Sequence, residues 1–276
     1  MTAFYNELDR YPAAWLRNLA AAGHIAPGVV DERSICDLTA DDVRGHRQAH
    51  YFAGLGGWSL ALRLAGVPDD ADIWTGSCPC QPLSVAGLQR GHQDHRHLWP
   101  VWHRLIAECR PPVLFGEQVG RPVGRAWLTA VRADLEDLGY AVGAADLAAA
   151  SVGAPHIRQR IFFGAVQRDR LGLGLGLGHP ARVEARPASR STRRAGADGG
   201  RNVGPWDDAE LIACHDPKRG LIYRPAPTDP RIPVVAHARR GGHRVAKLRA
   251  GGNAIVPEAA AAFVAAFLEA VAEMTL

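Results

Sequence analysis

The sequence predicts an α/β fold, in which an open sheet carries helices on both faces. Short apolar runs alternate with helix-period patterns through the first 166 residues, as in ADIWTGS (71–77) followed by LWPVWHRLIAEC (98–109). Alternation of this kind is typical of α/β sheets. The chain has 276 residues, of which 47% are hydrophobic, so it has room for one large domain or one domain with a small insert.

Seven strands and five helices are expected from these patterns. The strands are at residues 3–7, 33–38, 49–54, 71–77, 112–119, 141–148 and 160–166. The helices are at residues 10–22, 58–65, 98–109, 126–138 and 257–274. Asp9 is a capping residue for the first helix, Pro12 is tolerated in its first turn and Gly23 ends it. Gly66 stops the second helix, and Pro257 opens the last one.

The region between Gln167 and Arg244 breaks this pattern. It opens on a low-complexity repeat, LGLGLGLG (171–178), which is typical of a flexible connector. We therefore expect three parts: a main α/β domain at 1–166, a small and partly flexible lobe at 167–244, and a returning segment with its helix at 245–276.

Composition limits the class of protein. No run of about 18 apolar residues exists, so no membrane span is expected, and the N-terminus lacks a signal-peptide pattern. The five cysteines are an odd number without framework spacing, which favours a reducing cytoplasm. The net charge of +4 mildly favours a polyanionic partner. Six arginines against two acids over residues 182–201 form either a solvated loop or a segment that follows a phosphate backbone.

The stretch TGSCPCQPLS (75–84) places two cysteines directly after an expected strand. Zinc sites need about four ligands, commonly in CxxC pairs, and the CxC spacing here has no second thiol pair, so no metal is expected. A redox pair would also more commonly read CxxC. One cysteine fits a buried structural role. Cys80 lies on the loop at a strand's carboxyl end, where open α/β sheets bind ligands, and is the candidate nucleophile.

A glycine-rich turn, FAGLGG (52–57), joins a strand to a helix. Glycines let the backbone turn sharply and approach a ligand, and a helix N-terminus favours an anion. The spacing differs from the dinucleotide-binding GxGxxG pattern. A tight turn and a cofactor loop are therefore both open interpretations.

Two further stretches carry polar side chains at strand ends. Glu117, in VLFGEQV, is either a surface acid or, in a cleft, a carboxyl group held protonated as an acid or donor. Arg158 and Arg160 lie two apart in an extended chain, so both point to the same side. They form either a solvated basic edge or a fork of donors for a base edge or phosphate.

Taken together, these stretches resemble the DNA cytosine-5 methyltransferases. The matching blocks are, in chain order, FAGLGG (52–57), PCQ (79–81), GEQV (116–119), RQR (158–160) and GGNAIVP (251–257), with GLQRGHQDHRHLW (87–99) similar to a further block. The resemblance covers roughly residues 50–165 and 245–275. It implies a Rossmann-like sheet that binds S-adenosylmethionine, with 167–244 as a small irregular target-recognition insert.

The N-terminal blocks depart from the family's order. In the family the cofactor loop precedes two strands that bind the ribose and the adenine, whereas about twenty residues separate Gly57 from Cys80 here. YNELDRYPAAWLRNL (5–19) resembles the ribose block and RSICDLTADDV (33–43) the adenine block. The resemblance implies a local permutation, in which strands two and three come first and strand one precedes strand four. We expect a sheet ordered 3-2-1-4-5, with Glu7 at the ribose and Asp37 at the adenine amino group.

The resemblance also implies a role for each matching residue. Cys80 adds to C6 of a flipped-out cytosine, Glu117 holds N3 and the exocyclic amine, Arg160 binds the O2 carbonyl and Arg158 orders the loop. The implied cofactor contacts are Phe52, Gly54, Gly56, Gly57, Glu7, Asp37, Pro79, Leu98, Asn253 and Ala254. The implied DNA contacts are Gln81, Ser84, Arg190, Arg193 and Arg194.

Three residues near these motifs need separate interpretation. Gln118 stands where the family has asparagine, a residue that mainly supports the loop, so we expect the change to be tolerated. His156 replaces a glutamine. Cys78 has no role in the chemistry and is expected to be structural.

The resemblance implies S-adenosylmethionine as cofactor, released as S-adenosylhomocysteine, and double-stranded DNA as partner. A monomer in the cytoplasm of a bacterial or phage-infected cell, associated with the nucleoid, is expected. Three alternatives stay open: an RNA cytosine-5 methyltransferase acting on tRNA, a DNA-binding paralogue that has lost turnover, and a small-molecule methyltransferase that does not use the cysteine.

Overall fold

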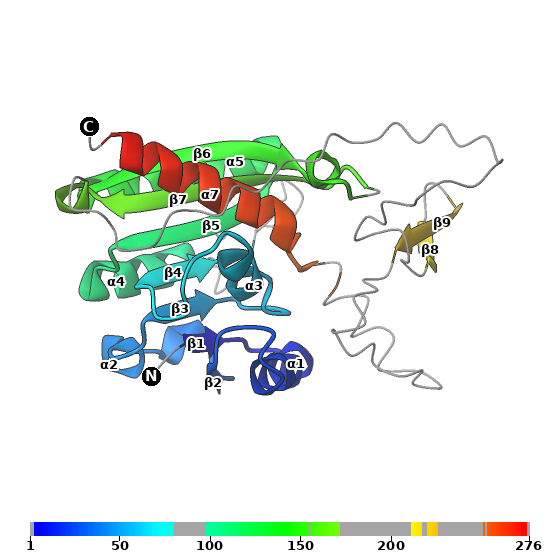
Figure 1. Ribbon diagram of the computed structural model, residues 1–276, viewed down its shortest axis with the longest axis horizontal. Coiled ribbons are helices and arrows are strands. Elements are labelled where there is room, and N and C mark those ends of the chain that lie inside the picture. The colour runs from blue at the N-terminus through cyan, green and yellow to red at the C-terminus, as the bar shows by residue number, and fades with distance from the viewer. Residues whose placement is uncertain are drawn as a thin grey trace, which may run out of the picture.

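The computed structural model describes residues 3–79, 98–154, 156–171, 211–216, 220–225, 251 and 253–274 (Figure 1). Several sequence-based expectations concern residues outside these ranges. They are the nucleophile Cys80, its neighbours Gln81 and Ser84, nearly all of the 171–178 repeat, and Arg190, Arg193 and Arg194.

A seven-stranded sheet forms the centre of the fold, which confirms the α/β class. Its strands are β1 (Ala3–Asn6), β2 (Gly28–Asp31), β3 (Gln48–Tyr51), β4 (Ile73–Gly76), β5 (Val113–Val119), β6 (Tyr140–Ala148) and β7 (Gln159–Gln167). In space they run β2-β1-β3-β4-β5-β7-β6, with the first five parallel and β7 antiparallel to both of its neighbours. A separate antiparallel pair consists of β8 (Leu211–Asp216) and β9 (Gly220–Pro225).

The strand order confirms the expected permutation. The third strand of the chain, β3, is inserted between β1 and β4 and pairs in parallel with both. Such an order demands that the chain cross back over β1 after leaving β2. The short helix α2 (Ala40–Val43) lies in this crossover. The two N-terminal strands therefore occupy the edge of the sheet that the 3-2-1-4-5 order requires.

The prediction of a strand at residues 33–38 is wrong. The strand at this place is β2, which ends at Asp31, and residues Ile35–Asp37 form a 3-10 turn instead. The physical reason is local side-chain hydrogen bonding, which competes with strand pairing. The Ser34 hydroxyl accepts a hydrogen bond from the Cys36 amide, and Asp42 bonds back to Thr39 at the start of α2.

The longer helices agree with the sequence signals. They are α1 (Arg10–Ala21), α3 (Gly57–Leu64), α4 (Trp99–Cys109), α5 (Pro122–Asp137) and α7 (Pro257–Glu273). Asp9 caps α1 by accepting a hydrogen bond from the Tyr11 amide at 3.0 Å. Gly23 and Gly66 follow α1 and α3 with positive φ angles, as the helix-stop signals require. Within the described ranges, no helix has the length and apolar character needed to cross a membrane.

Helices cover both faces of the sheet, as expected. On one face α7 packs across β5, β6 and β7, and Phe115 of β5 meets Phe263 of α7 edge to face (Figure 1). On the other face α4 and α5 pack around Leu114, which is fully buried. A third cluster joins α1 to α3 beside β1. Alternate residues of β5 thus enter opposite cores, so the strand is buried on both sides.

Two strand glycines allow aromatic rings to lie directly on the sheet. A Cβ atom at Gly116 would lie 2.2 Å from the ring of Phe163, and one at Gly76 would lie 2.6 Å from the ring of Trp102. Both rings belong to residues that are fully buried. These contacts fix the sheet at the point where β4 and β5 approach their carboxyl ends.

Gly116→Ala should destabilise the fold by about 1–3 kcal/mol, because the added methyl group has no space between β5 and Phe163. Thermal unfolding measures this loss. Gly251→Ala is the matched control, since a Cβ at Gly251 meets no atom within 4 Å. Equal melting temperatures for the two variants would contradict the close packing at Gly116.

Candidate active site

The carboxyl ends of four adjacent parallel strands meet at one edge of the sheet. The pairing places Asn6, Tyr51, Gly76 and Gly116 in register across β1, β3, β4 and β5. The residues that follow these positions therefore converge on the same edge, as in other open α/β sheets that bind ligands there. They include Glu7, the glycine-rich turn, the segment leading to Cys80, and Glu117.

The glycine-rich turn between β3 and α3 has an unusual backbone. Phe52, Gly54 and Gly56 all have positive φ angles, of 52°, 55° and 79°. For Phe52 this conformation is strained, because a side chain disfavours it. Gly57 opens α3 and contacts Ile255 so closely that a Cβ would lie 2.6 Å from the isoleucine side chain. The returning segment thus packs directly on the turn.

Glu7 links the end of β1 to this turn. Its carboxylate accepts hydrogen bonds from the Gly54 amide at 2.8 Å and from the Asp9 amide at 2.9 Å. Its own amide donates to the Asp31 carbonyl at 3.0 Å. Burial raises the pKa of Glu7, and the two amide donors oppose that rise. The next residue, Leu8, leaves 67% of its surface exposed at this edge, an apolar feature that the sequence patterns did not single out.

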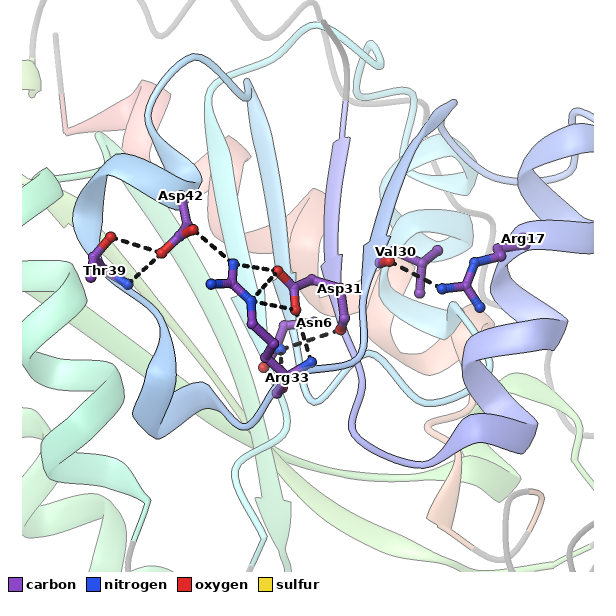
Figure 2. Close-up of polar contacts among 7 residues, drawn as sticks. All are labelled: Asn6, Arg17, Val30, Asp31, Arg33, Thr39 and Asp42. Atoms are coloured by element: carbon purple, nitrogen blue, oxygen red, sulfur yellow. Dashed lines mark hydrogen bonds and ion pairs between the residues drawn. The ribbon is translucent and has the colours of Figure 1, made fainter.

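Asp37, the acid expected at the adenine, does not lie at a strand end. It is exposed in the 3-10 turn. The acid at the carboxyl end of β2 is Asp31, which the sequence analysis missed (Figure 2). The signal for it was the β-branched pair in GVVD, directly after Pro27, which is short but typical of a strand. The acid at the strand end is therefore Asp31, and the role expected for Asp37 at the adenine stays a prediction.

Glu117 and Arg160 form a buried ion pair. Arg160 Nε lies 2.6 Å from Glu117 Oε1, and the glutamate side chain is 9% exposed. The antiparallel pairing of β5 with β7 explains this, because it sets Arg160 opposite Val119, two residues along the strand from Glu117. The structure therefore brings together two of the expected catalytic residues.

Arg158 turns toward the C-terminal segment. Its guanidinium donates to the Ala254 carbonyl at 2.5 Å, and its φ of 33° lies in the left-handed region. Since Ile255 packs on Gly57, residues 254 and 255 connect the arginine segment to the glycine-rich turn. Asn253 is exposed beside them.

Opposing effects act on the Glu117 carboxyl group. Burial is the largest influence and raises the pKa of Glu117, while the charges of Arg160 and Arg158 and a hydrogen bond to Ser77 lower it in part. The net direction is upward. Glu117 is therefore better placed than an ordinary glutamate to hold or deliver a proton.

The segment before Cys80 is held by its neighbours. Gln118 Nε2 donates to the Cys78 carbonyl at 3.2 Å, and Trp58 Nε1 donates to the Ser77 hydroxyl at 3.1 Å. Cys78 is buried and Pro79 is exposed. Gln118 thus supports the loop, the role expected for the asparagine that it replaces. Leu98 is half-buried and occupies the N-cap position of α4.

No group of three or more histidine, cysteine or acidic side chains in the described ranges could hold a metal ion.

Replacing Arg160 by methionine should raise the pKa of Glu117 further, because a positive charge 2.6 Å from the carboxylate is removed. A ¹³C NMR titration of the Glu117 carboxyl carbon measures this. Arg125→Met, which removes an ion pair with Asp146 at the surface, is the control and should leave the titration unchanged. A Glu117 pKa below its ordinary value in the unmodified protein would contradict the upward shift that burial produces.

Comparison with known proteins shows which proteins this part of the chain is similar to. Residues 61–173 match the family model of the C-5 cytosine-specific DNA methylases. The Type II methyltransferase M.AplI of Arthrospira platensis is 37% identical over 98 residues, which are 35% of this chain and 28% of that protein. The Type II methyltransferase M.HhaI of Haemophilus parahaemolyticus is 28% identical over 173 residues, or 48% of this chain and 53% of that protein.

The crystal structure of a Spodoptera frugiperda DNMT2 mutant is similar with a TM-score of 0.43 at 14% identity, covering 60% of this chain and 42% of that one. This chain spans about a quarter to a half of the length of the two curated relatives. The family match runs from α3 to the end of β7 and includes the PCQ, GEQV and RQR blocks. Over residues 61–173, this chain is therefore similar to the C-5 cytosine-specific DNA methylases.

Proposed function

We propose that this protein transfers a methyl group from S-adenosylmethionine to C5 of a cytosine in double-stranded DNA. The buried Glu117–Arg160 pair carries the proposal, since it lies at the end of β5 beside the strand that leads to Cys80. A carboxyl group with a raised pKa and a guanidinium, held together, match the donor and acceptor pattern of cytosine's N3, exocyclic amine and O2.

The proposed reaction begins with addition of the Cys80 thiolate to C6 of the base. A sulfur–carbon bond forms, and the electron pair of the C5–C6 double bond makes C5 nucleophilic. After C5 is methylated, its proton passes to water, the C–H electron pair re-forms the C5–C6 double bond, and the sulfur–C6 bond breaks, which regenerates the thiolate. The proton that Glu117 supplied returns to its carboxylate. Covalent addition of this kind divides one difficult step into easier ones.

Glu117 holds N3 and the exocyclic amine and supplies the proton that neutralises the adduct. Arg160 stabilises the negative charge that develops at O2. Arg158 acts on the segment rather than on the base, because its guanidinium is engaged by the Ala254 carbonyl. Preorganised charges act most strongly where water is excluded, and Glu117 is buried accordingly.

The edge beside the glycine-rich turn fits S-adenosylmethionine. The glycines of the turn let its backbone approach a ligand closely. Glu7 supplies a carboxylate for the ribose hydroxyls, and exposed Leu8 offers an apolar surface for the adenine. When bound, S-adenosylmethionine supplies a methyl group activated by its sulfonium and leaves as S-adenosylhomocysteine.

Phe52, Gly54, Gly56, Pro79, Leu98, Asn253 and Ala254 complete the proposed cofactor contacts. Asp31 at the end of β2 and Asp37 in the turn that follows are the acids proposed at the adenine end.

Double-stranded DNA is the proposed substrate. The curated relatives are named Type II methyltransferases, and the arginine-rich stretch of this chain provides side chains for phosphate contacts. The base has to leave the stack to reach Cys80, so Gln81 and Ser84, next to the nucleophile, are proposed to contact the DNA.

Cys80→Ala should abolish formation of 5-methylcytosine in duplex DNA incubated with labelled S-adenosylmethionine, while binding of S-adenosylhomocysteine persists. Nucleoside digestion and mass spectrometry measure the product. Cys36→Ala, at an exposed cysteine away from the strand ends, is the matched control and should keep full activity. Turnover by Cys80→Ala would refute the nucleophile, and methylation of tRNA but not of duplex DNA would move the substrate to RNA.

Glu117→Gln should lower kcat by about 100-fold or more, because an amide cannot supply the proton. The amide is nearly isosteric, so the melting temperature measures whether the fold is kept. Full activity of a folded Glu117→Gln protein would remove Glu117 from the mechanism.

A further inference from the structure

A charged network stands at the carboxyl end of β2 (Figure 2). Arg33 Nε bonds both carboxylate oxygens of Asp31, at 3.2 and 3.0 Å, and Arg33 Nη2 reaches Asp31 Oδ2 at 2.6 Å. The same Nη2 also donates to Asp42 Oδ1 at 2.7 Å. Asp42 in turn accepts from the amide and hydroxyl of Thr39, at 2.8 and 2.7 Å. One guanidinium therefore ties the strand end to the start of α2.

This network reaches the cofactor edge through the backbone. The Asp31 carbonyl accepts the amide of Glu7, and the Asn6 side chain donates to the carbonyls of Asp31 and Arg33, at 3.4 and 2.9 Å. The Asn6 carbonyl also accepts from the amide of Ala53, in the glycine-rich turn. The position of Glu7 thus depends on where residues 31–33 are held.

The charges fit this arrangement. Glu7 and Asp31 are acids at the ends of the adjacent strands β1 and β2. The positive charge of Arg33 compensates the negative charge of Asp31. Burial alone would raise the pKa of Asp31, yet the bonds from Arg33 hold it below its ordinary value, so Asp31 is ionised. The Arg33 side chain is 49% exposed.

We propose that Arg33 is a positioning residue for the adenosine part of S-adenosylmethionine. It holds Asp31 and the backbone of residues 31–33, and through them Glu7, in the arrangement that receives the nucleoside. This inference rests on the proposed function, because it takes the edge between β1 and β2 as the nucleoside side of the cofactor site. Arg33 itself acts through Asp31 and Glu7.

The test compares Arg33→Gln with Arg132→Gln by calorimetric measurement of the binding of S-adenosylhomocysteine and of adenosine. Arg132 is the control, because it forms a partly exposed ion pair of the same type with Glu136 on α5, outside the segment of residues 31–33. Arg33→Gln should lower the affinity for both ligands by a similar factor, about fivefold, the scale of one net hydrogen bond. Arg132→Gln should leave both affinities unchanged.

Three further readouts separate positioning from a general structural role. Arg33→Gln should raise KM for S-adenosylmethionine while kcat at saturating cofactor and the melting temperature stay close to those of the unmodified protein. Arg33→Lys, which keeps the charge but loses the fork, should recover part of the affinity. Asp42→Asn combined with Arg33→Gln should weaken binding no more than Arg33→Gln alone, because both act through one network.

Unchanged affinities in Arg33→Gln would overturn this inference and leave the proposed function standing. A fall in melting temperature and kcat with unchanged affinity would also overturn it, in favour of a purely structural role. Absence of S-adenosylhomocysteine binding by the unmodified protein would refute the cofactor assignment as well. Cofactor binding without methylation of any cytosine would refute only the proposed reaction.

Discussion

The parallel pairing of β3 with both β1 and β4 is the constraint on which the rest of the structure depends. It brings the ends of these strands to one edge, whatever their order along the chain. Polar contacts beneath the edge support this pairing. His50 of β3 bonds Thr75 of β4 at 2.8 Å, and Tyr5 of β1 stacks on the His50 ring. Burial lowers the pKa of His50 to about 3, so the imidazole is neutral at physiological pH and adds no uncompensated charge.

The proposed function depends on the residues at the carboxyl ends of these strands, because their side chains connect one strand end to the next. Glu7 joins β1 to the glycine-rich turn, while Gln118 joins β5 to the carbonyl of Cys78. The C-terminal segment closes the arrangement, because Ala254 accepts from Arg158 and Ile255 packs on Gly57. The two halves of the proposed reaction, cofactor binding and base chemistry, thus share one set of backbone supports. A permuted chain keeps them because each contact depends on sheet neighbours and not on sequence order.

Much of this could be predicted from the sequence. Apolar periodicity and helix caps indicated six of the seven central strands and the longer helices, and motif order implied the place of β3. The exception, β2, is a four-residue edge strand with exposed and half-buried residues, so it lacks the alternating pattern of a buried strand. RSICDL carried more apolar residues, but the side chains of Ser34 and Asp42 accept hydrogen bonds from backbone amides and form a turn there. Local bonds between side chain and backbone are not visible in periodicity, so the sequence patterns missed Asp31 as the acid at the strand end.

The candidate site was predictable where chemistry depends on residue type and strand ends, as for Glu117 and Arg160. Their separation of 2.6 Å needed the register of β5 with β7, which no short motif specifies. The roles of Arg33 and Leu8 needed the fold, because nothing in their local sequence marks them.

A covalent trap tests the central claim most directly. Duplex DNA that contains 5-fluorocytosine has no C5 proton to lose, so the thiolate cannot be expelled after methylation. With S-adenosylmethionine present, we predict a protein–DNA adduct whose nuclease and protease digest carries the modified base on Cys80. An adduct on another residue, or product formation from ordinary cytosine with no adduct from the fluorinated base, would contradict the account.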